Sequence, residues 1–143
     1  MREGELAFSR QFRKELAAFD VTVAQYQHLR QLFEGDGLSQ GELSRQLGVE
    51  SASSTATLDS LERQQLIRRV RNRSDRRKVN VFLTSKGRAL RGDLIECARR
   101  TNIVATEGLT DAQVKSFFIT IRHVLANLRK HENDSSADNP DRR

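Results

Sequence analysis

The sequence predicts a mainly α-helical fold with one β-hairpin, and three observations support this. Apolar residues recur at intervals of three and four along most of the chain, as in amphipathic helices. Several of these segments open with Ser or Thr followed three residues later by Glu or Gln, which is a helix-capping signal. One basic segment, residues 68–83, instead has strand composition on both sides of a turn and is typical of a hairpin.

Four helices are expected before the hairpin. The first spans about residues 5–19, where four apolar side chains share one stripe: Phe8, Phe12, Leu16 and Phe19. Thr22 and Gln25 cap a second helix that reaches about Phe33. Ser39 and Glu42 cap a short third helix, which Gly48 closes. A fourth helix runs from about Ser51 to Gln64.

Two helices are expected after the hairpin. A long helix covers about residues 85–106, and Gly108 ends it. Thr110 then caps a last helix that extends to about Lys130. Its apolar face is broad: Val114, Phe117, Phe118, Ile121, Val124, Leu125 and Leu128. The polar tail, residues 131–143, is expected to be disordered.

This order of elements divides the chain into a middle and two flanks. Residues 22–84 form the middle, while residues 1–21 and 85–130 form the helical flanks. The flanking helices carry apolar stripes that a helical monomer of about 130 residues has few surfaces to cover. A second copy of the chain is the natural cover, so the flanks are expected to be a dimerisation region.

One short segment carries the net charge of the whole chain. Residues 68–78 hold seven basic side chains against a single acid, Asp75, which gives the segment a charge of +6. The full chain also has a charge of +6, so the remaining residues sum to zero. Such concentrated positive charge is typical of a segment that binds a phosphate backbone. The turn composition of residues 72–75 puts it at the tip of the hairpin.

Composition argues against several other functions. The chain lacks an apolar run of about eighteen residues, so no membrane helix or membrane partner is expected. It begins without the apolar region of a secretory signal, and its one cysteine fits a reducing cytoplasm. Three scattered histidines, without zinc spacing or a Gly-rich phosphate loop, predict no metal, no cofactor and no enzyme. Cys97 lies on an apolar stripe, and the sequence leaves any redox role for it open.

Residues 39–64 have the form of a helix-turn-helix, in which the second helix enters the major groove of DNA. Short polar or small side chains crowd the start of that helix, and we expect the following to contact DNA: Ser51, Ser53, Ser54, Thr55, Ala56 and Thr57. A Ser/Thr run alone is more typical of a loop. Its position, directly after a capped short helix, favours the recognition helix.

At this point the chain resembles the MarR family of winged helix-turn-helix regulators. Residues 75–87, DRRKVNVFLTSKG, resemble its wing signature: an Asp-x-Arg tip, a strand ending in Leu-Thr, and a Gly three residues later. Residues 38–49, LSQGELSRQLGV, resemble its helix-turn-helix segment. Four further positions match its recognition helix: Thr55, Asp59, Leu61 and Glu62. The resemblance covers about residues 5–130 and implies a homodimer that binds palindromic operator DNA, in most members as a repressor.

The resemblance also implies roles for particular residues. Arg77 would enter the minor groove while Asp75 holds its guanidinium, although such a pair could also be an ordinary surface ion pair. Other wing residues are expected to contact phosphates: Arg71, Arg73, Arg76 and Lys78. Ser39 and Gln40, at the start of the third helix, are expected to contact the DNA backbone.

The chain departs from the family pattern at three positions. Ala56 and Ser60 stand where arginines are frequent, so the recognition helix is poor in side chains that make bidentate contacts to guanine. We therefore expect readout through Ser, Thr and thymine methyl contacts, together with DNA shape. Gln65 replaces the usual Gly before the wing, which predicts backbone strain at this position.

Many members of the family release DNA when a small molecule binds beside the dimer helices. By analogy, the candidate effector pocket is lined by Phe8, Phe12, Tyr26, His28 and Arg30. Apolar walls with one cation would suit an aromatic or phenolic acid. Core packing for the aromatic residues and solvent exposure for Arg30 is the alternative interpretation.

The sequence thus predicts a cytoplasmic, homodimeric regulator of transcription that binds specific double-stranded DNA. One alternative is a non-specific nucleic-acid-binding or architectural protein that uses the same basic hairpin. Another is a winged helix whose arginines dock on an acidic protein. The operator, the effector and the choice between repression and activation do not follow from the sequence.

Overall fold

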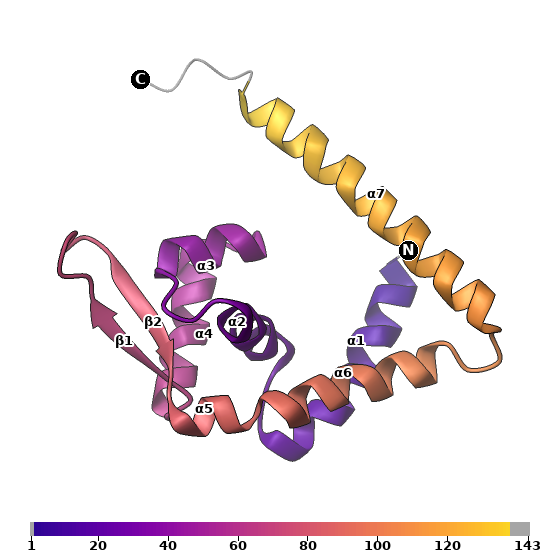
Figure 1. Ribbon diagram of the computed structural model, residues 1–143, viewed down its shortest axis with the longest axis horizontal. Coiled ribbons are helices and arrows are strands. Elements are labelled where there is room, and N and C mark those ends of the chain that lie inside the picture. The colour runs from indigo at the N-terminus through magenta and orange to yellow at the C-terminus, as the bar shows by residue number, and fades with distance from the viewer. Residues whose placement is uncertain (1, 138–143) are drawn as a thin grey trace. The chain divides into compact units, whose positions relative to one another are not determined.

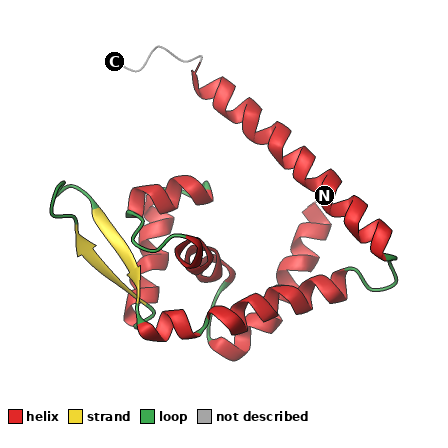
Figure 2. Cartoon of the chain, viewed as in Figure 1, coloured by secondary structure: helices red, strands yellow, loops and turns green. Residues whose placement is uncertain are grey.

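The structure, a computed structural model, describes residues 2–137 of the chain (Figure 1). Contacts divide the chain into two units, Met1–Ala105 and Thr106–Arg143, and each is described by itself. Helices dominate, and the described residues contain one two-stranded antiparallel sheet (Figure 2). The predicted mainly α fold with a β-hairpin wing is confirmed.

The first unit contains all of the predicted helix-turn-helix and wing. Its elements in chain order are α1 (Arg2–Leu16), the 3-10 turn η1 (Ala17–Phe19), α2 (Val23–Glu34), α3 (Gln40–Leu47), α4 (Ser51–Arg63), β1 (Ile67–Arg71), β2 (Val79–Leu83), α5 (Ser85–Ala89) and α6 (Arg91–Ala105). Helix α1 packs on α6, and both contact α2, which packs in turn on α3 and α4.

Both capping boxes predicted for this unit are present. The Thr22 hydroxyl accepts a hydrogen bond from the Gln25 amide, while the Gln25 side chain accepts one from the Thr22 amide. Ser39 and Glu42 make the same reciprocal pair at the start of α3. Gly48 ends α3 in the left-handed conformation, with φ of 64°. These local signals determine where α2 and α3 begin and where α3 ends.

The hairpin is tied to the rest of the unit through a third short segment. Strands β1 and β2 pair in antiparallel register from Ile67 opposite Leu83 to Arg71 opposite Val79. On the other side of β2, the Val81 amide donates to the Leu38 carbonyl, at 2.8 Å, and the Gly37 amide donates to Val81. The wing is therefore fixed to the segment that leads into α3.

The core of this unit lies between the helices and the base of the hairpin. Its fully buried side chains come from α1, α2, α3, α4, β1, β2 and α6: Leu16, Leu29, Leu32, Leu43, Leu58, Leu61, Ile67, Val81 and Leu94. Leucine dominates this set, and burial of each such side chain contributes about 1.5–3 kcal/mol. The core thus holds the recognition helix and the wing strands on one support.

The long helix predicted for residues 85–106 is divided into α5 and α6 at Leu90. Helix α5 packs tightly against the chain that enters the hairpin. A Cβ atom at Gly87 would lie 2.1 Å from the Leu66 carbonyl oxygen, so this helix turn can approach Leu66 only because residue 87 has no side chain. This close contact fixes the position of α5 against the chain that enters the hairpin.

Gln65 has the strained backbone that its replacement of a glycine predicts. Its φ is +60°, in the left-handed region, where a side chain is disfavoured. The turn is held by the Gln65 amide, which donates to Glu62, and by the Thr84 hydroxyl, which donates to the Gln65 carbonyl at 2.6 Å. The left-handed conformation of Gln65 allows the chain to reverse its direction between α4 and β1.

The second unit consists mainly of one helix, α7 (Asp111–Ala137). Thr110 and Gln113 cap it reciprocally, as predicted. The helix continues past the expected end at Lys130, since no Pro or Gly interrupts residues 131–137. The rest of the tail that the sequence predicts to be disordered, residues 138–143, lies outside the described residues. Most of its large apolar side chains are exposed, including Phe117, Leu125 and Leu128. Among the described residues, no helix has the length and apolar character needed to cross a membrane.

Candidate nucleic-acid interface

The recognition helix and the wing border a shared groove on the surface of the first unit. Its lining includes Gln40 and Arg45 of α3, Ser51 and Thr55 of α4, and Arg77 and Lys78 of the wing. The α4 side therefore carries small polar side chains and the wing side carries cations, while α3 adds both Arg45 and Glu42. This arrangement suits a ligand that presents both polar edges and negative charge.

The predicted contact residues of α4 do not all point outward. Ser51, Ser53, Thr55 and Ala56 are exposed, and Thr57 is half-buried with its hydroxyl donating to the Ser53 carbonyl at 3.0 Å. Ser54 is buried, with 2% of its surface exposed. Helical periodicity explains the difference, because Ser54 lies on the same face as Leu58 and Leu61. Ser54 therefore lines the groove from a buried position, and its contact with bases stays a prediction.

Ser54 joins the recognition helix to α2 through His28. The buried His28 ring lies with Nδ1 2.8 Å from the Ala24 carbonyl and Nε2 3.0 Å from the Ser54 hydroxyl. If Nδ1 donates to the carbonyl, Nε2 is the acceptor of the serine proton. Burial lowers the pKa of His28, although the Ala24 carbonyl opposes this effect. The neutral ring is thus the form that the folded protein favours.

At the wing tip, Asp75 and Arg77 form the predicted pair. The Asp75 carboxylate accepts hydrogen bonds from both the backbone amide and Nε of Arg77, each at 3.1 Å. The arginine side chain is 91% exposed. These hydrogen bonds lower the pKa of Asp75, so the carboxylate stays charged. The guanidinium is oriented, yet it remains available to a ligand.

An amide chain that the sequence did not reveal supports the wing tip. Asn72 accepts from the amides of Ser74 and Asp75, which closes the turn. The Asn72 side chain then donates to Asn80, at 2.9 Å, and Asn80 donates to the Gly37 carbonyl at 2.7 Å. Asparagine at a turn was a visible signal, but the pairing across the hairpin depends on its register.

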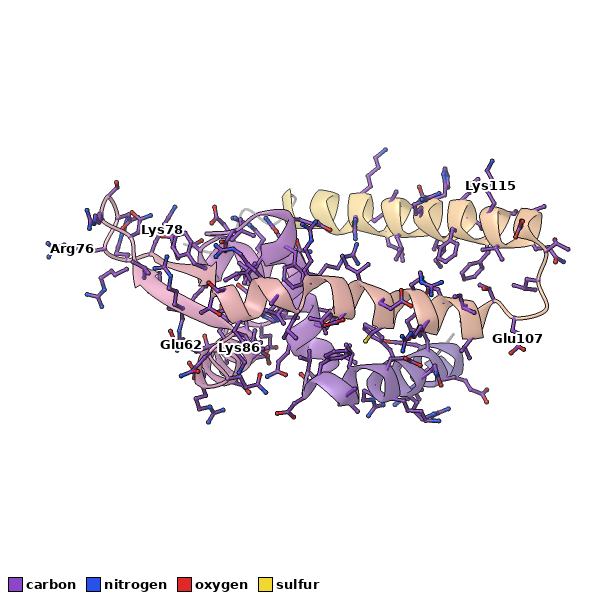
Figure 3. All side chains as sticks on the ribbon, turned by 60° about the horizontal axis from the view of Figure 1, so that its bottom comes forward. Glu62, Arg76, Lys78, Lys86, Glu107 and Lys115 are labelled. Atoms are coloured by element: carbon purple, nitrogen blue, oxygen red, sulfur yellow. The ribbon has the colours of Figure 1, made fainter. Side chains whose placement is uncertain are left out.

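The basic side chains of the segment 68–78 differ in their surroundings. Arg71, Arg73, Arg76 and Lys78 are exposed. Figure 3 shows Arg76 and Lys78 projecting from the outer part of the hairpin. Arg68 lies over the Phe82 ring, 5.0 Å from its centroid. Arg69 is instead paired with Asp59 and Glu62 of α4. The cationic charge that faces solvent is therefore concentrated at the outer end of the wing.

The two predicted backbone-contact residues of α3 have partners within the protein. The Ser39 hydroxyl donates to Glu42 at 2.7 Å, and Ser39 is buried. This bond, with the Ser39 amide, lowers the pKa of Glu42. Gln40 is half-buried, and its side-chain oxygen lies 3.4 Å from a guanidinium nitrogen of Arg69. Both residues sit at the rim of the groove and shape it.

The predicted effector residues divide between two places. The Phe12 and Tyr26 rings meet edge to face, with centroids 4.7 Å apart, and Phe8 extends this aromatic row at the surface. Tyr26 and Arg30 also line a small hollow together with Arg91 and Ile95. His28 instead faces α4. The effector pocket stays a prediction, with Tyr26 and Arg30 as the pair that shares one hollow.

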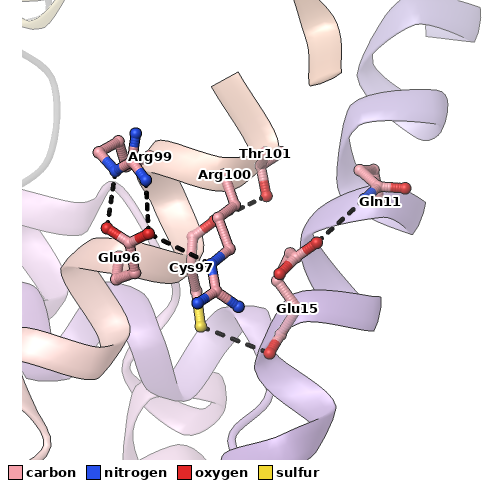
Figure 4. Close-up of polar contacts among 7 residues, drawn as sticks. All are labelled: Gln11, Glu15, Glu96, Cys97, Arg99, Arg100 and Thr101. Carbon is pink, nitrogen blue, oxygen red and sulfur yellow. Dashed lines mark hydrogen bonds and ion pairs between the residues drawn. The ribbon is translucent and has the colours of Figure 1, made fainter. Parts of the chain in front are cut away.

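Cys97 lies on α6 and faces Glu15 of α1 (Figure 4). The buried thiol donates to the Glu15 carbonyl at 3.4 Å, and burial raises its pKa. Neighbouring Glu96 pairs with Arg99 and Arg100, which lower its pKa to about 2. Within the described part of the chain, no three His, Cys, Asp or Glu residues lie together as a metal site would require.

The fold and the groove together define a winged helix-turn-helix protein. A comparison of folds agrees: a MarR transcriptional regulator from Methanosarcina mazei Go1 has a TM-score of 0.85 over 90% of this chain and 93% of its own, at 22% identity. A mutant MarR from E.coli, solved in complex with operator DNA, has a TM-score of 0.76 over 87% of this chain and 89% of its own, at 25% identity.

The sequence comparisons specify the family. The MarR family matches residues 21–79, which contain α2 through the start of β2. The HTH-type transcriptional regulator TtmR of Methylorubrum extorquens (strain PA1) is 41% identical over 95 residues, or 66% of this chain. This chain spans 48% of the length of TtmR. Residues 21–79 therefore match the MarR family, and the fold of the chain is that of MarR regulators. Its relatives are named as transcriptional regulators, not as enzymes.

Proposed function

We propose that this protein is a sequence-specific, double-stranded DNA-binding regulator of transcription that acts in the cytoplasm. One observation carries the proposal: the groove that sets the exposed start of α4 opposite the oriented guanidinium of Arg77. A helix in the major groove and an arginine in the adjacent minor groove would use the two walls of this groove together. The E.coli MarR, whose fold this chain shares, was solved with operator DNA.

The two walls contribute in different ways. Small side chains at the start of α4, Ser51, Thr55 and Ala56, offer hydroxyls and methyl groups to base edges. Arg77 would sit in a narrow, electronegative minor groove, and Asp75 limits the conformations that the guanidinium must give up on binding. The exposed Arg71, Arg73, Arg76 and Lys78 would neutralise phosphates. Specificity then comes from shape and methyl contacts, while affinity comes largely from charge.

Binding of the protein to its own upstream DNA tests this function. Fluorescence anisotropy would compare that fragment with a random duplex of equal length at the same salt concentration. We expect tighter binding to the upstream fragment, and a loss of about tenfold or more for Arg77→Ala. Arg13→Ala, an exposed arginine of α1, is the matched control and should bind as the parent does.

Two outcomes would favour the alternatives. Equal affinity for upstream and random DNA would indicate a non-specific or architectural protein. Unchanged DNA affinity in Arg77→Ala would indicate that the wing serves another partner, such as an acidic protein.

We further propose a homodimer that binds a palindromic operator and represses the genes it controls. The broad apolar face of α7 and the exposed Leu6 and Phe8 of α1 support self-association, because solvent-exposed surfaces of this kind are costly. An aromatic or phenolic effector in the hollow of Tyr26 and Arg30 would release the DNA. In-vitro transcription, with and without candidate phenolic acids, tests both repression and release.

A further inference from the structure

We propose that Arg69 is a positioning residue that locks the recognition helix to the wing, so that the two enter adjacent DNA grooves at a fixed separation. This inference rests on the proposed DNA-binding function. Arg69 lies within the basic segment, residues 68–78, but its side chain is paired with carboxylates of the protein itself.

The geometry of Arg69 joins three elements. Its Nη2 atom lies 2.7 Å from Asp59 Oδ1 and 2.7 Å from Glu62 Oε2, both on α4. Its Nε atom donates to the same Glu62 oxygen at 2.9 Å. Nη1 donates to Gln40 of α3 at 3.4 Å, and the Arg69 backbone amide donates to the other Glu62 oxygen at 2.9 Å. One residue of β1 is thus hydrogen-bonded to both helices of the helix-turn-helix.

Burial and charge separate Arg69 from the arginines at the tip. The side chain of Arg69 is 23% exposed, whereas that of Arg77 is 91% exposed. Asp59 and Glu62 neutralise its charge, and Arg69 in turn lowers the pKa of Glu62. A guanidinium whose charge is neutralised by two carboxylates attracts a phosphate only weakly. Its contribution to DNA binding must therefore be geometric.

The connection between α4 and β1 explains why such a lock is needed. Only Gln64, Gln65 and Leu66 separate the two elements, and Gln65 is held in the left-handed conformation. The base of the hairpin is anchored by Ile67 and Val81 in the core and by the hydrogen bond from Val81 to Leu38. The Arg69 contacts lie a further step along β1 and add a direct attachment of the strand to α4, which limits the remaining movement between the hairpin and that helix. Because β1 pairs with β2, the whole wing follows.

The test compares Arg69→Ala and Arg69→Lys with Arg76→Ala in the full-length protein, using a duplex obtained by binding selection from a random pool. Affinity is measured over a range of salt concentrations, and thermal unfolding verifies that each variant is folded. We expect Arg69→Ala to lose about tenfold in affinity, comparable with one mismatched base pair. The slope of log affinity against log salt should stay that of the parent, whereas Arg76→Ala should lower its magnitude by about 0.9.

The charge-preserving variant separates position from charge. Lysine lacks the planar fork that holds two carboxylates at once, so Arg69→Lys should lose most of the affinity that Arg69→Ala loses. Combining Arg69→Ala with Arg77→Ala should give less than the product of the single losses, since a wing that is no longer positioned has little left to lose. Full affinity in Arg69→Lys, parental affinity in Arg69→Ala, or a lower salt slope in Arg69→Ala would each overturn the proposal.

A measurement without DNA distinguishes failure of this inference from failure of the proposed function. Spin labels at Ser53→Cys and Arg73→Cys, in a Cys97→Ser background diluted with unlabelled protein, report the distance from α4 to the wing by electron spin resonance. We expect a narrow distribution with Arg69 and a broad one with Arg69→Ala. Equal widths would overturn the lock even if DNA binds. If Arg69→Ala broadens the distance distribution but the parent protein binds no DNA, only the proposed DNA-binding function would be rejected.

Discussion

At the scale of single residues, the arginines of the basic segment differ because their surroundings differ. Arg77 is exposed and oriented by Asp75, while Arg69 is half-buried between two carboxylates of α4. Asn72 and Asn80 then fix the hairpin that carries them. The same residue type therefore serves as a candidate groove contact in one place and as a structural link in another.

Substitution of Gln65 by glycine would measure the backbone strain at this position. Since its φ is +60°, Gln65→Gly should raise the free energy of unfolding by about 1 kcal/mol, because the left-handed conformation costs a residue with a side chain about that much. Urea denaturation measures the change. Arg63→Gly, at the helical end of α4, is the matched control and should lower the stability by a similar amount. A destabilised Gln65→Gly would contradict the strain.

His28 should make the stability of the protein depend on pH. Its pKa is lowered in the folded state, so the unfolded chain takes up a proton first as the pH falls. The stability contributed by neutral His28 is complete above pH 6.5 and decreases below it, toward the lower folded pKa. Comparing unfolding at pH 7.5 and 5.5 should show a smaller decrease for His28→Gln than for the parent. Equal decreases would exclude His28 as the cause.

At the scale of elements, the wing is not an independent hairpin. Its base packs in the core through Ile67 and Val81, β2 pairs with Leu38, and α5 closes against Leu66. Recognition helix α4 is likewise held by His28 on one side and by Arg69 on the other. The two elements that we propose to contact DNA are therefore positioned by contacts with α2, α3 and each other.

Two glycines early in the segment after the wing test this packing. Gly87→Ala should lower the free energy of unfolding by about 2 kcal/mol or more, because the new methyl group would collide with the Leu66 carbonyl. Gly92→Ala is the matched control in α6, where a Cβ would have nothing within 4 Å, and should instead stabilise the protein by about 0.5–1 kcal/mol. Thermal and urea unfolding measure both. Similar effects of the two substitutions would contradict the close packing of α5.

At the scale of the whole molecule, the exposed apolar face of α7 has the properties of an interface. Phe117, Leu125 and Leu128 are between 44% and 55% exposed, and they lie on one side of a long helix. Exposed apolar surface of this extent favours association with a second copy. Self-association would also place two reading units on one DNA duplex.

Sedimentation velocity tests this expectation. The protein should sediment as a dimer at micromolar concentration, and Ile121→Lys with Leu125→Lys should shift it to a monomer, because two ammonium groups would be buried on the apolar face. Ser116→Lys, on the opposite side of α7, is the control and should leave the dimer intact. A folded monomer of the parent protein, or a dimer that survives the double substitution, would place the interface elsewhere.

Features that depend only on neighbouring residues in the chain could be predicted from the sequence. Caps at Thr22, Ser39 and Thr110 and the turn at the wing tip followed from local patterns, as did the mainly α fold with its hairpin. The strain at Gln65 was expected from the resemblance to a family that usually has Gly there, and the structure shows a φ of +60°. Such features are short-range, and a few residues contain the information they need.

The contacts between residues far apart in the chain could be known only from the folded structure. It turned Ser54 inward to His28, separated His28 from Tyr26 and Arg30, divided the helix after the wing at Leu90, and removed Arg69 from the cationic surface. Each of these depends on which elements pack together, because side-chain partners 7 to 26 positions apart are chosen by packing and not by spacing. The charge of residues 68–78 was readable from the sequence, whereas its division between contact and support was not.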